Sequence, residues 1–520
     1  MRTNPPPSGC FQLKKGIRMI RAPGAGVLLQ SNPLRALKIN RAALEILEKC
    51  RSGMQVDPKE GDAENKKILP FLDTFVQAGL LTWEPAQNQD LPLVSVVIPV
   101  YNRPQEIRQC LASLEALDYP ADKIEVIVVD DGSRDHTAAV VRRFDARLII
   151  QPYNRGQSAA RNTGARVARG EIIAFLDSDC IAGPRWLRDL VPYFQDSRVA
   201  LVGGFVDAYY REKRMDRYEQ VCSALNMGSQ QAMGRGENCV FYVPTCNMLV
   251  RKDIYLQAGG LDDCLRVGED VDLCWRLMAA GHHLLYIPRG AVAHKHRNRL
   301  LSGLLRRFDY GTSEAVLYAR FPKVAKQFPW QPVGLAMILL GAAALATQSW
   351  LWLVLLAILP AIEAGFKLFQ LVRKFDIRLP IAEILGACLK SHFQLTYYLS
   401  FYMVRYHLPL LVALVCAIPT GIGLWLPVIM IPGLVTYLQK RPRLSFPVFL
   451  FFYLAEHAFY QCGAFWGCLK QRSFRLYRIF FRHAGFLHRT RPSAKMHSRG
   501  RDQTPKETLN GSVWRRRKAA

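Results

Sequence analysis

The chain has 520 residues, half of them hydrophobic, and its length predicts two to four domains rather than a single core. Lysine and arginine outnumber the acidic residues 69 to 42, and a net charge of +27 on so apolar a chain is typical either of nucleic-acid binding or of a membrane protein with basic flanks. Because the densest basic segments border apolar ones and none interleaves aromatic with basic residues, the pattern argues against nucleic acid as a partner and predicts a membrane protein.

Residues 1–25 are predicted to be an N-terminal extension. The N-terminus has no sustained apolar core, so it is not expected to be a signal peptide. Thirteen cysteines are scattered along the chain without a Cys-x-x-Cys pair or another metal-ligand spacing. An odd number in this arrangement indicates reduced thiols rather than a disulfide framework. The N-terminal part of the chain is therefore expected in the cytoplasm.

Residues 26–88 are predicted to form a small winged-helix-like module. The apolar residues 27–30 are typical of a strand, and Asn40 can cap the helix that follows it. A second helix is expected over residues 67–78, where Gly79 ends it before the chain extends again. Strand, helix, helix and strand in so short a segment favour the winged-helix pattern.

Residues 91–307 alternate strands with helices. Continuous apolar runs at 94–100, 124–129 and 172–176 are typical of strands buried on both faces of a parallel sheet. A helix is expected over 158–168, before the third strand. This alternation predicts an α/β fold.

The first two of these strands end in residues that suit a nucleotide. Ligands of open α/β sheets bind beyond the carboxyl ends of the strands, and the first strand ends in Pro99 and Tyr101, whose ring can lie against a base. The second ends in Asp130 and Asp131, whose carboxylates can accept hydrogen bonds from a base and from ribose. An Asp-Gly-Ser sequence also forms a simple turn, which is the alternative.

Two further segments suit a diphosphate and a metal ion. Residues 154–164 place glycines, Arg155 and Arg161 at the start of a helix, although a capped helix with a salt-bridging arginine has the same pattern. The third strand ends in Asp177 and Asp179. Carboxylates are the ligands of a hard divalent ion that also holds phosphates.

A later segment combines acids with histidines. Glu269 and Asp270 open a helix, and a carboxylate at a helix N-terminus is a candidate general base for an acceptor hydroxyl. His294 or His296 could complete the metal shell through an imidazole nitrogen. A basic surface run next to a membrane is the alternative for both histidines.

In this order the segments resemble the family 2 glycosyltransferases of the GT-A fold over residues 91–307. The resemblance implies that three residues hold a uracil-type base: Pro99, Tyr101 and Asp131. It also implies that Asp177 faces the ribose and that Asp179 binds Mg²⁺ or Mn²⁺ bridging the diphosphate of a nucleotide sugar.

The resemblance also implies a mechanism. Asp270, five residues before Trp275, matches the family's catalytic base, with Glu269 the next candidate. The family reaction is a single inverting displacement, in which the base removes the acceptor proton and the metal stabilises the departing diphosphate. Processive members carry a QxxRW motif after the catalytic domain, and the absence of that motif from this sequence argues against a polymer-extruding synthase.

Residues 330–470 are predicted to be a transmembrane or amphipathic helical region. Residues 331–362 carry no charge and suffice for one tilted span or for two helices broken near 347–349. A second uncharged run, 408–438, has proline and glycine at its middle, which indicates a re-entrant hairpin or a kinked span, and 445–469 is a third candidate. The expected location is the cell membrane, multi-pass, with the catalytic domain cytoplasmic; a buried helical core is the alternative.

Both ends of the chain refine this prediction. Residues 487–520 are basic and polar, so a disordered tail in contact with anionic lipid is expected. The segments PLRALKIN (33–40) and AGLL (78–81) resemble the PqqD-like peptide-recognition modules. Such a module ahead of a family 2 transferase, with membrane helices behind it, resembles the transferases of the mycofactocin system.

This second resemblance implies transfer of glucose from UDP-glucose to a peptide-derived small-molecule acceptor, mycofactocin or its precursor, with membrane lipids as further partners. A family 2 transferase for a cell-envelope lipid or polysaccharide would suit the membrane region equally. The third alternative is an inactive, membrane-tethered peptide-binding protein, against which the intact set of Asp177, Asp179 and Asp270 argues.

Overall fold

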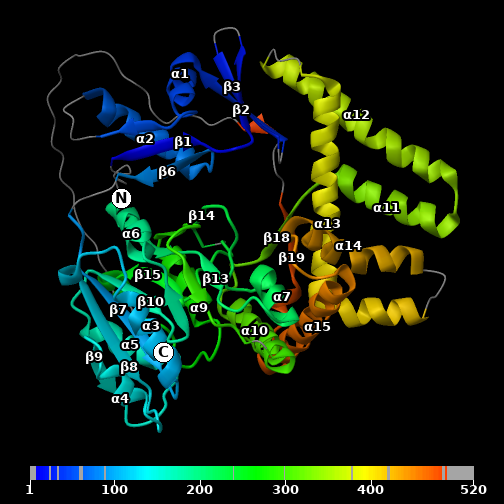
Figure 1. Cartoon of the computed structure of the whole chain (residues 1–520). Coiled ribbons are helices and arrows are strands. Elements are labelled where there is room, and N and C mark those ends of the chain that lie inside the picture. Colours follow the sequence, from blue (N-terminus) through cyan, green and yellow to red (C-terminus); the bar gives the residue numbers. More distant parts are fainter. Residues whose placement is uncertain are drawn as a thin grey trace, which may run out of the picture.

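A computed structural model describes residues 8–22, 25–31, 34–57, 63–86, 90–237, 239–297, 299–375, 379–417, 422–482 and 487–488. Figure 1 shows an α/β domain, a smaller N-terminal part of strands and two helices beside it, and a helical region to one side. All but the first two residues of the predicted disordered tail lie outside the described residues.

The α/β domain is built on a mixed sheet of eight strands in the order β14-β16-β12-β15-β10-β7-β8-β9. The strands β7 to β10 are parallel, whereas β15 runs antiparallel to both of its neighbours. The α/β prediction and its three apolar strands are confirmed. The strands are β7 (Val94–Val100), β8 (Ile124–Asp130), β9 (Arg147–Ile150), β10 (Ile172–Leu176), β12 (Val199–Gly203), β14 (Ala232–Gly234), β15 (Asn247–Arg251) and β16 (His283–Tyr286).

A three-stranded sheet and seven helices complete this domain among the described residues. The small sheet has the order β11 (Cys180–Ala182), β17 (Val292–His294) and β13 (Val206–Ala208). A Cβ at Gly164 would lie 2.5 Å from a Val97 methyl, so the glycine allows α5 to approach β7 closely. The helices are α3 (Pro104–Leu114), α4 (Thr137–Val141), α5 (Gln157–Val167), α6 (Trp186–Leu190), α7 (Arg214–Cys222), α8 (Lys252–Gln257) and α9 (Glu269–Ala279).

The N-terminal part contains two sheets and the two predicted helices, α1 (Arg41–Lys49) and α2 (Ala63–Gln77). Asn40 caps α1 by accepting a hydrogen bond from the Ala43 N–H at 2.8 Å. Strands begin at Gly9, so the segment predicted as an extension already contributes two strands, and the winged-helix type of the module stays a prediction. One sheet is β5 (Met54–Val56), β1 (Gly9–Leu13) and β6 (Leu81–Pro85); the other is β2 (Ile17–Ala22), β3 (Ala25–Ser31), β4 (Leu34–Asn40) and β20 (Leu487–His488).

An ion-pair cluster joins this part to the α/β domain. The Arg198 guanidinium lies between Asp73 of α2 and Asp196, with N–O distances of 2.7 Å to each. The Trp83 ring of β6 meets the Tyr193 ring edge-on at 5.9 Å. The two parts therefore share one packed core.

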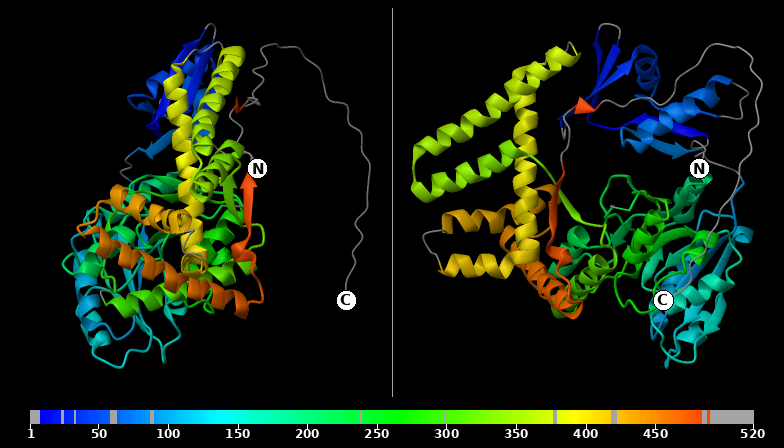
Figure 2. Two further views of the ribbon diagram at one scale, coloured as in Figure 1. Left: turned by 90° about the vertical axis from the view of Figure 1, so that its right-hand side faces the viewer. Right: turned by 180° about the vertical axis from the view of Figure 1, so that it is seen from behind.

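The helical region carries two hairpins that project to the same side of the molecule (Figure 2). The predicted break near residues 347–349 is confirmed, because α11 ends at Thr347 and α12 begins at Trp350. The third predicted span corresponds to α15, which packs along α10 instead. The elements are α10 (Leu300–Arg320), β18 (Lys326–Pro329), α11 (Pro332–Thr347), α12 (Trp350–Phe375), α13 (Ile381–Ala417), α14 (Ile422–Lys440), α15 (Phe446–Lys470) and β19 (Ile479–Arg482).

Two helices of the described residues are long and apolar enough to cross a membrane by length and composition: Trp350–Lys374 and Ile381–Ala417. Helix α13 is not straight, because His407 has non-helical dihedral angles (φ −136°) just before Pro409. The part of α13 after this kink runs beside α14 to form the second hairpin (Figure 1).

Candidate active site

A cavity of about 720 Å³ lies at the carboxyl ends of β7, β8 and β10, between α9 and α10. The buried parallel strands bring their carboxyl ends to one edge of the sheet, which explains why residues distant in the sequence meet there. Nine of the ten predicted site residues line the cavity: Pro99, Tyr101, Asp131, Arg161, Asp177, Asp179, Glu269, Asp270 and His294.

The tenth residue, Asp130, is the last residue of β8, and its side chain caps the turn that follows the strand. Its carboxylate is 1% exposed and accepts a hydrogen bond from the Ser133 N–H at 2.8 Å, as in the turn that was the alternative for this sequence. The neighbouring Asp131 accepts hydrogen bonds from the N–H groups of Arg155 and Gly156, both at 2.8 Å. Asp131 therefore joins the end of β8 to the loop before α5 at the cavity wall, and burial raises its pKa.

Arg161 connects two carboxylates beneath the cavity. Its guanidinium, 1% exposed, donates to Asp177 at 2.5 Å and to Glu269 at 3.4 Å. Burial alone would raise the pKa of Asp177, but the charge and hydrogen bond of Arg161, together with the charges of His294 and Arg103, outweigh burial and lower that pKa. Arg161 also lines the cavity, so its predicted contact with a diphosphate stays a prediction beside its observed pairing with the two carboxylates.

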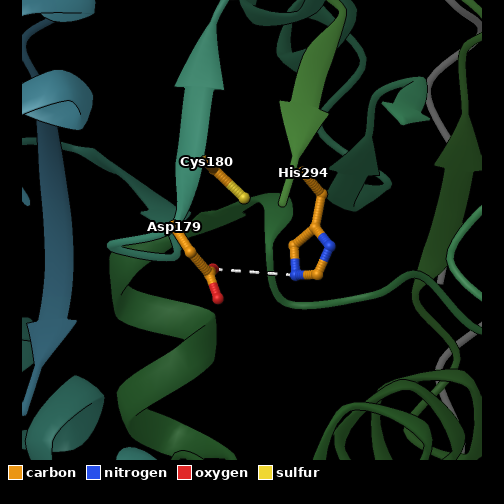
Figure 3. A group of neighbouring side chains, drawn as sticks. All are labelled: Asp179, Cys180 and His294. Carbon is orange, nitrogen blue, oxygen red and sulfur yellow. Dashed lines mark ion pairs between the residues drawn. The ribbon is translucent and has the colours of Figure 1, made fainter. Parts of the chain in front are cut away.

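Asp179 and His294 lie together because β11 pairs with β17, which sets Cys180 opposite His294. The His294 Nε2 lies 3.6 Å from the Asp179 Oδ1 (Figure 3). That oxygen is buried and has no hydrogen-bond donor among the described residues, while Arg103 donates to the other oxygen. The other histidine, His296, lies 3.4 Å from Asp216, so the fold brings His294 rather than His296 to Asp179.

These donor atoms fit a hard divalent ion. The ligand atoms that Asp179, Cys180 and His294 could offer lie within 4.8 Å of one another. A carboxylate oxygen suits Mg²⁺ or Mn²⁺, and an imidazole nitrogen adds a neutral ligand to the same group. Burial raises the pKa of the Cys180 thiol well above its ordinary value, so the thiol stays neutral and is a poor ligand.

Glu269 and Asp270 differ in their surroundings although they are neighbours in the first turn of α9. Glu269 is 4% exposed and accepts hydrogen bonds from Gln157 at 2.7 Å and from Arg161. Asp270 accepts a hydrogen bond from the Val271 N–H at 2.8 Å, and no side chain of the described residues donates to it. Asp270 is therefore the carboxylate of this pair that remains available to a bound substrate.

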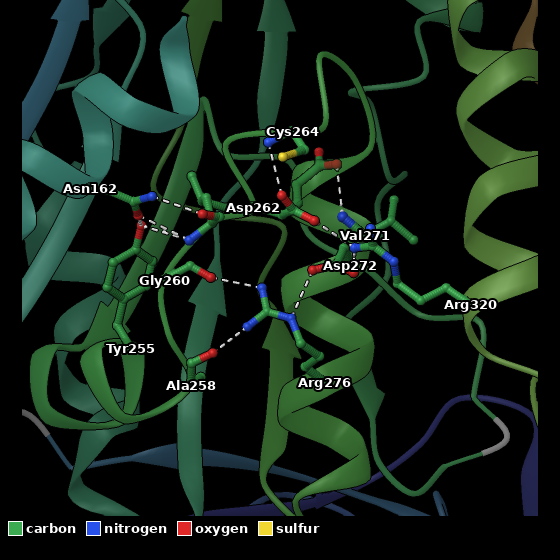
Figure 4. A network of polar contacts seen from close by, with 12 residues as sticks. Asn162, Tyr255, Ala258, Gly260, Asp262, Cys264, Val271, Asp272, Arg276 and Arg320 are labelled. Carbon is green, nitrogen blue, oxygen red and sulfur yellow. Dashed lines mark hydrogen bonds and ion pairs between the residues drawn. The ribbon is translucent and has the colours of Figure 1, made fainter. Parts of the chain in front are cut away.

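A polar network holds α9 in place (Figure 4). Asp272 accepts from Arg276 at 2.7 Å and from Arg320 of α10 at 2.8 Å. Arg276 also donates to the carbonyl oxygens of Ala258 and Gly260. This network fixes the first turn of α9, and with it Asp270, against the loop after α8 and against α10.

One wall of the cavity comes from residues that the motifs did not predict. These residues are basic or aromatic and belong to α10, α13 and α15: Arg306, Arg307, Tyr310, Arg405 and Tyr460. Trp275 also lines the cavity, and its buried Nε1–H has no acceptor among the described residues. One of these residues could have been predicted from the sequence. Arg405 is an ionisable residue next to an uncharged run, and such residues often have a function.

The strand ends, the helix-borne carboxylate and the Asp179–His294 pair meet in one cavity of the size that small-molecule sites have. Residues 95–256 match the family model of Glycosyl transferase family 2. This match identifies residues 95–256 as a family 2 glycosyltransferase domain, and the mixed sheet agrees with a GT-A-like fold.

The chain is similar to proteins named "Pre-mycofactocin glycosyltransferase" from two strains of Mycobacterium tuberculosis, with 36% identity over 310 residues. The alignment covers 59% of this chain and 63% of the relative, so the chain spans less than two thirds of that protein's length. Glycosyltransferase AglE of Haloferax volcanii is 36% identical over 203 residues, which cover 38% of this chain and 64% of AglE.

Among solved structures, the mannosyltransferase PcManGT from Pyrobaculum calidifontis, in complex with GDP-Man and Mn²⁺, is 21% identical. The aligned residues cover 60% of this chain and 90% of the mannosyltransferase, with a TM-score of 0.36.

Proposed function

We propose that the protein is a metal-dependent, inverting hexosyltransferase that moves glucose from UDP-glucose to mycofactocin or its peptide-derived precursor at the cytoplasmic face of the membrane. The observation that carries the proposal is the pairing of an available base, Asp270, with the Asp179–His294 site in one cavity. The similarity to the pre-mycofactocin glycosyltransferases supports the proposed acceptor.

In the proposed reaction Asp270 accepts the proton of an acceptor hydroxyl, whose oxygen attacks the anomeric carbon as the bond to the diphosphate breaks. Glu269, bonded to Gln157 and Arg161, keeps the first turn of α9 in position. Pro99, Tyr101 and Asp131 line the part of the cavity proposed for the base, and Asp177 the part proposed for the ribose. Mg²⁺ or Mn²⁺, held by Asp179 and His294, would stabilise the negative charge on the departing diphosphate.

A donor panel tests the proposal. Purified full-length protein is incubated with UDP-glucose and other UDP- and GDP-sugars, with Mn²⁺ and with the peptide-derived precursor as acceptor, and the released nucleoside diphosphate is measured. We expect release from UDP-glucose that depends on the acceptor and is lost in Asp270→Asn. Release from no donor in the panel would contradict the transferase assignment and favour the inactive, peptide-binding alternative.

A second candidate acceptor, a cell-envelope lipid or polysaccharide precursor, is favoured by one observation. The cavity wall includes Arg405 of α13 and Tyr460 of α15, and α13 continues directly into an apolar hairpin. Supplying a polyprenyl-linked acceptor in the same assay separates the two candidates, because only the true acceptor stimulates release of the diphosphate.

A further inference from the structure

The two helical hairpins share a pattern of charge and length. Residues 331–362 and 408–439 contain no Asp, Glu, Lys or Arg. The described residues of each run form two helical segments that pack against each other. At 1.5 Å per residue, half of either run extends about 24 Å, whereas the hydrocarbon core of a bilayer is about 30 Å thick. Neither uncharged run is long enough to cross a bilayer twice, and α12 and α13 reach the length of a span only by including the charge-bearing segments 363–374 and 381–407.

The surfaces of the hairpins suit lipid rather than water. Large apolar side chains are exposed along both hairpins, and a contiguous exposed apolar surface is typical of an interaction site. They are Leu339 70%, Leu345 54%, Trp350 73%, Leu353 56%, Leu410 53%, Ile422 49% and Leu426 47%. The charged side chains of the helical region lie outside these two runs. We call the ends of each hairpin that join the rest of the protein its roots.

The root of the first hairpin is held by protein. Glu363, the first charged residue after the run, pairs with Lys367 at 2.7 Å and with His392 at 2.6 Å. Beyond it, Ala364 and Leu371 of α12 pack against the β3 and β4 strands of the N-terminal part. At the other end, Gln331 donates to Ser391 of α13 at 3.0 Å.

The root of the second hairpin is held by the catalytic domain. Lys440, at the end of α14, donates to the Val221 carbonyl oxygen of α7 at 2.9 Å. Arg405, just before the kink of α13, lines the active-site cavity. Both hairpins thus begin and end on the side of the catalytic domain and project away from it together (Figure 2).

From these observations we infer that the two hairpins are re-entrant: they enter a phospholipid bilayer from the side of the catalytic domain and return without crossing it. The polar tip of the first hairpin is compatible with this depth, because the Thr347 hydroxyl satisfies the Ala343 carbonyl at 2.8 Å. The inference replaces multi-pass crossing with insertion from one side. It rests on the membrane location proposed above and is independent of the transfer reaction.

Native cysteines provide matched reporters. Cys264 is exposed on the catalytic domain, and Cys416 is exposed near the tip of the second hairpin. Ser349→Cys adds a reporter at the tip of the first. The full-length protein, in sealed membrane vesicles of either orientation, is treated with a membrane-impermeant maleimide, and each labelled cysteine is identified by peptide mass spectrometry. Protein denatured in SDS provides the positive control for reactivity.

We expect Cys264 to be labelled in one vesicle orientation only, and Cys416 and Ser349→Cys to be protected in both. Labelling of a tip cysteine from the side opposite Cys264 would show that the hairpin crosses and would overturn the inference. Labelling of both tips from the side of Cys264 would show that the hairpins lie outside the bilayer. A carbonate wash of the vesicles, which removes proteins that are not inserted, tests the membrane location separately from topology.

Discussion

Asp179 keeps one buried carboxylate oxygen without a hydrogen-bond donor, in a position that a metal ion can use. Asp179→Ala is expected to lower turnover at least about a hundredfold and to weaken binding of the nucleotide sugar, because the diphosphate loses its counter-charge. EDTA should reproduce both effects in the unmodified protein. Calorimetric titration with the donor in the presence of Mn²⁺ measures the binding.

A matched control is Asp207→Ala, which removes a carboxylate of β13 that pairs with Arg211 and does not line the cavity. This variant should retain donor binding. Full activity of the unmodified protein in EDTA would contradict the metal assignment.

Asp270 and Glu269 can be separated by their different hydrogen bonds. In Asp270→Asn the shape and the metal site persist, so donor affinity should be unchanged while turnover falls about a hundredfold or more. In Glu269→Gln the loss should be smaller, because Glu269 already accepts from Gln157 and Arg161 and acts by positioning. Steady-state kinetics with both variants decide the roles, and a larger loss in Glu269→Gln would identify Glu269 as the base.

The pH dependence of transfer follows from the same pair. Burial, and then the charge of Asp270, raise the pKa of Glu269 to about 7, and burial raises the pKa of Asp270 as well. A base acts only when deprotonated, so kcat/KM should fall as the pH drops through the raised pKa of Asp270. Because the two carboxylates interact, Glu269→Gln should move this fall to lower pH. A pH profile that is identical in the two proteins would mean that another group sets it.

At the scale of elements, the active site depends on a close contact between α10 and α15. A Cβ at Gly463 would overlap the Phe308 carbonyl oxygen, and one at Gly467 would lie 2.7 Å from the Thr312 carbonyl oxygen. These two glycines of α15, four residues apart, let the helix backbones approach as small residues do in membrane proteins. Both helices also contribute a tyrosine to the cavity wall.

Gly463→Val is therefore expected to destabilise the protein by about 1–3 kcal/mol or more and to reduce transfer, because the helices must separate. The thermal inactivation half-life of the detergent-solubilised protein measures the effect. Gly341→Val on α11 is the control, since a Cβ there meets nothing within 4 Å. Equal half-lives for the two variants would mean that the α10–α15 contact does not limit stability.

At the scale of the whole molecule, the N-terminal part is packed on the catalytic domain rather than tethered to it. The Arg198 side chain is 12% exposed, and its partners Asp73 and Asp196 are 10% and 7% exposed. Removing the arginine leaves two carboxylates unpaired at this interface. Arg198→Ala should therefore destabilise the folded protein by up to about 3 kcal/mol, as a lower melting temperature.

The exposed pair Arg185–Asp189, whose arginine is 60% exposed, provides the comparison. Arg185→Ala should change stability by less than about 1 kcal/mol, because water screens that pair. If Arg198→Ala melts like Arg185→Ala, the two parts are coupled by apolar contacts such as Trp83 on Tyr193 and not by the ion pairs.

The sequence by itself determined the chemical groups of the site and their order. Apolar runs that end in Tyr101, Asp131 and Asp179 mark buried strands whose carboxyl ends meet, and the same local pattern predicted the helix that begins at Glu269. The break between α11 and α12 could also be predicted from the sequence, because the residues that end a helix lie at the break itself. Short-range periodicity therefore sufficed for the α/β class, and the polar residues at the strand and helix ends included nine that line the cavity, out of ten predicted.

Only the tertiary structure decided between alternatives that are locally equivalent. Asp130 and Asp131 are adjacent, yet one closes a turn and the other lines the cavity, since their surroundings come from different segments. The choice of His294 over His296 depends on the pairing of β11 with β17, strands more than a hundred positions apart in the sequence. The direction in which the hairpins return depends likewise on contacts with α7 and β3. Such contacts depend on how distant segments pack, which no local pattern encodes.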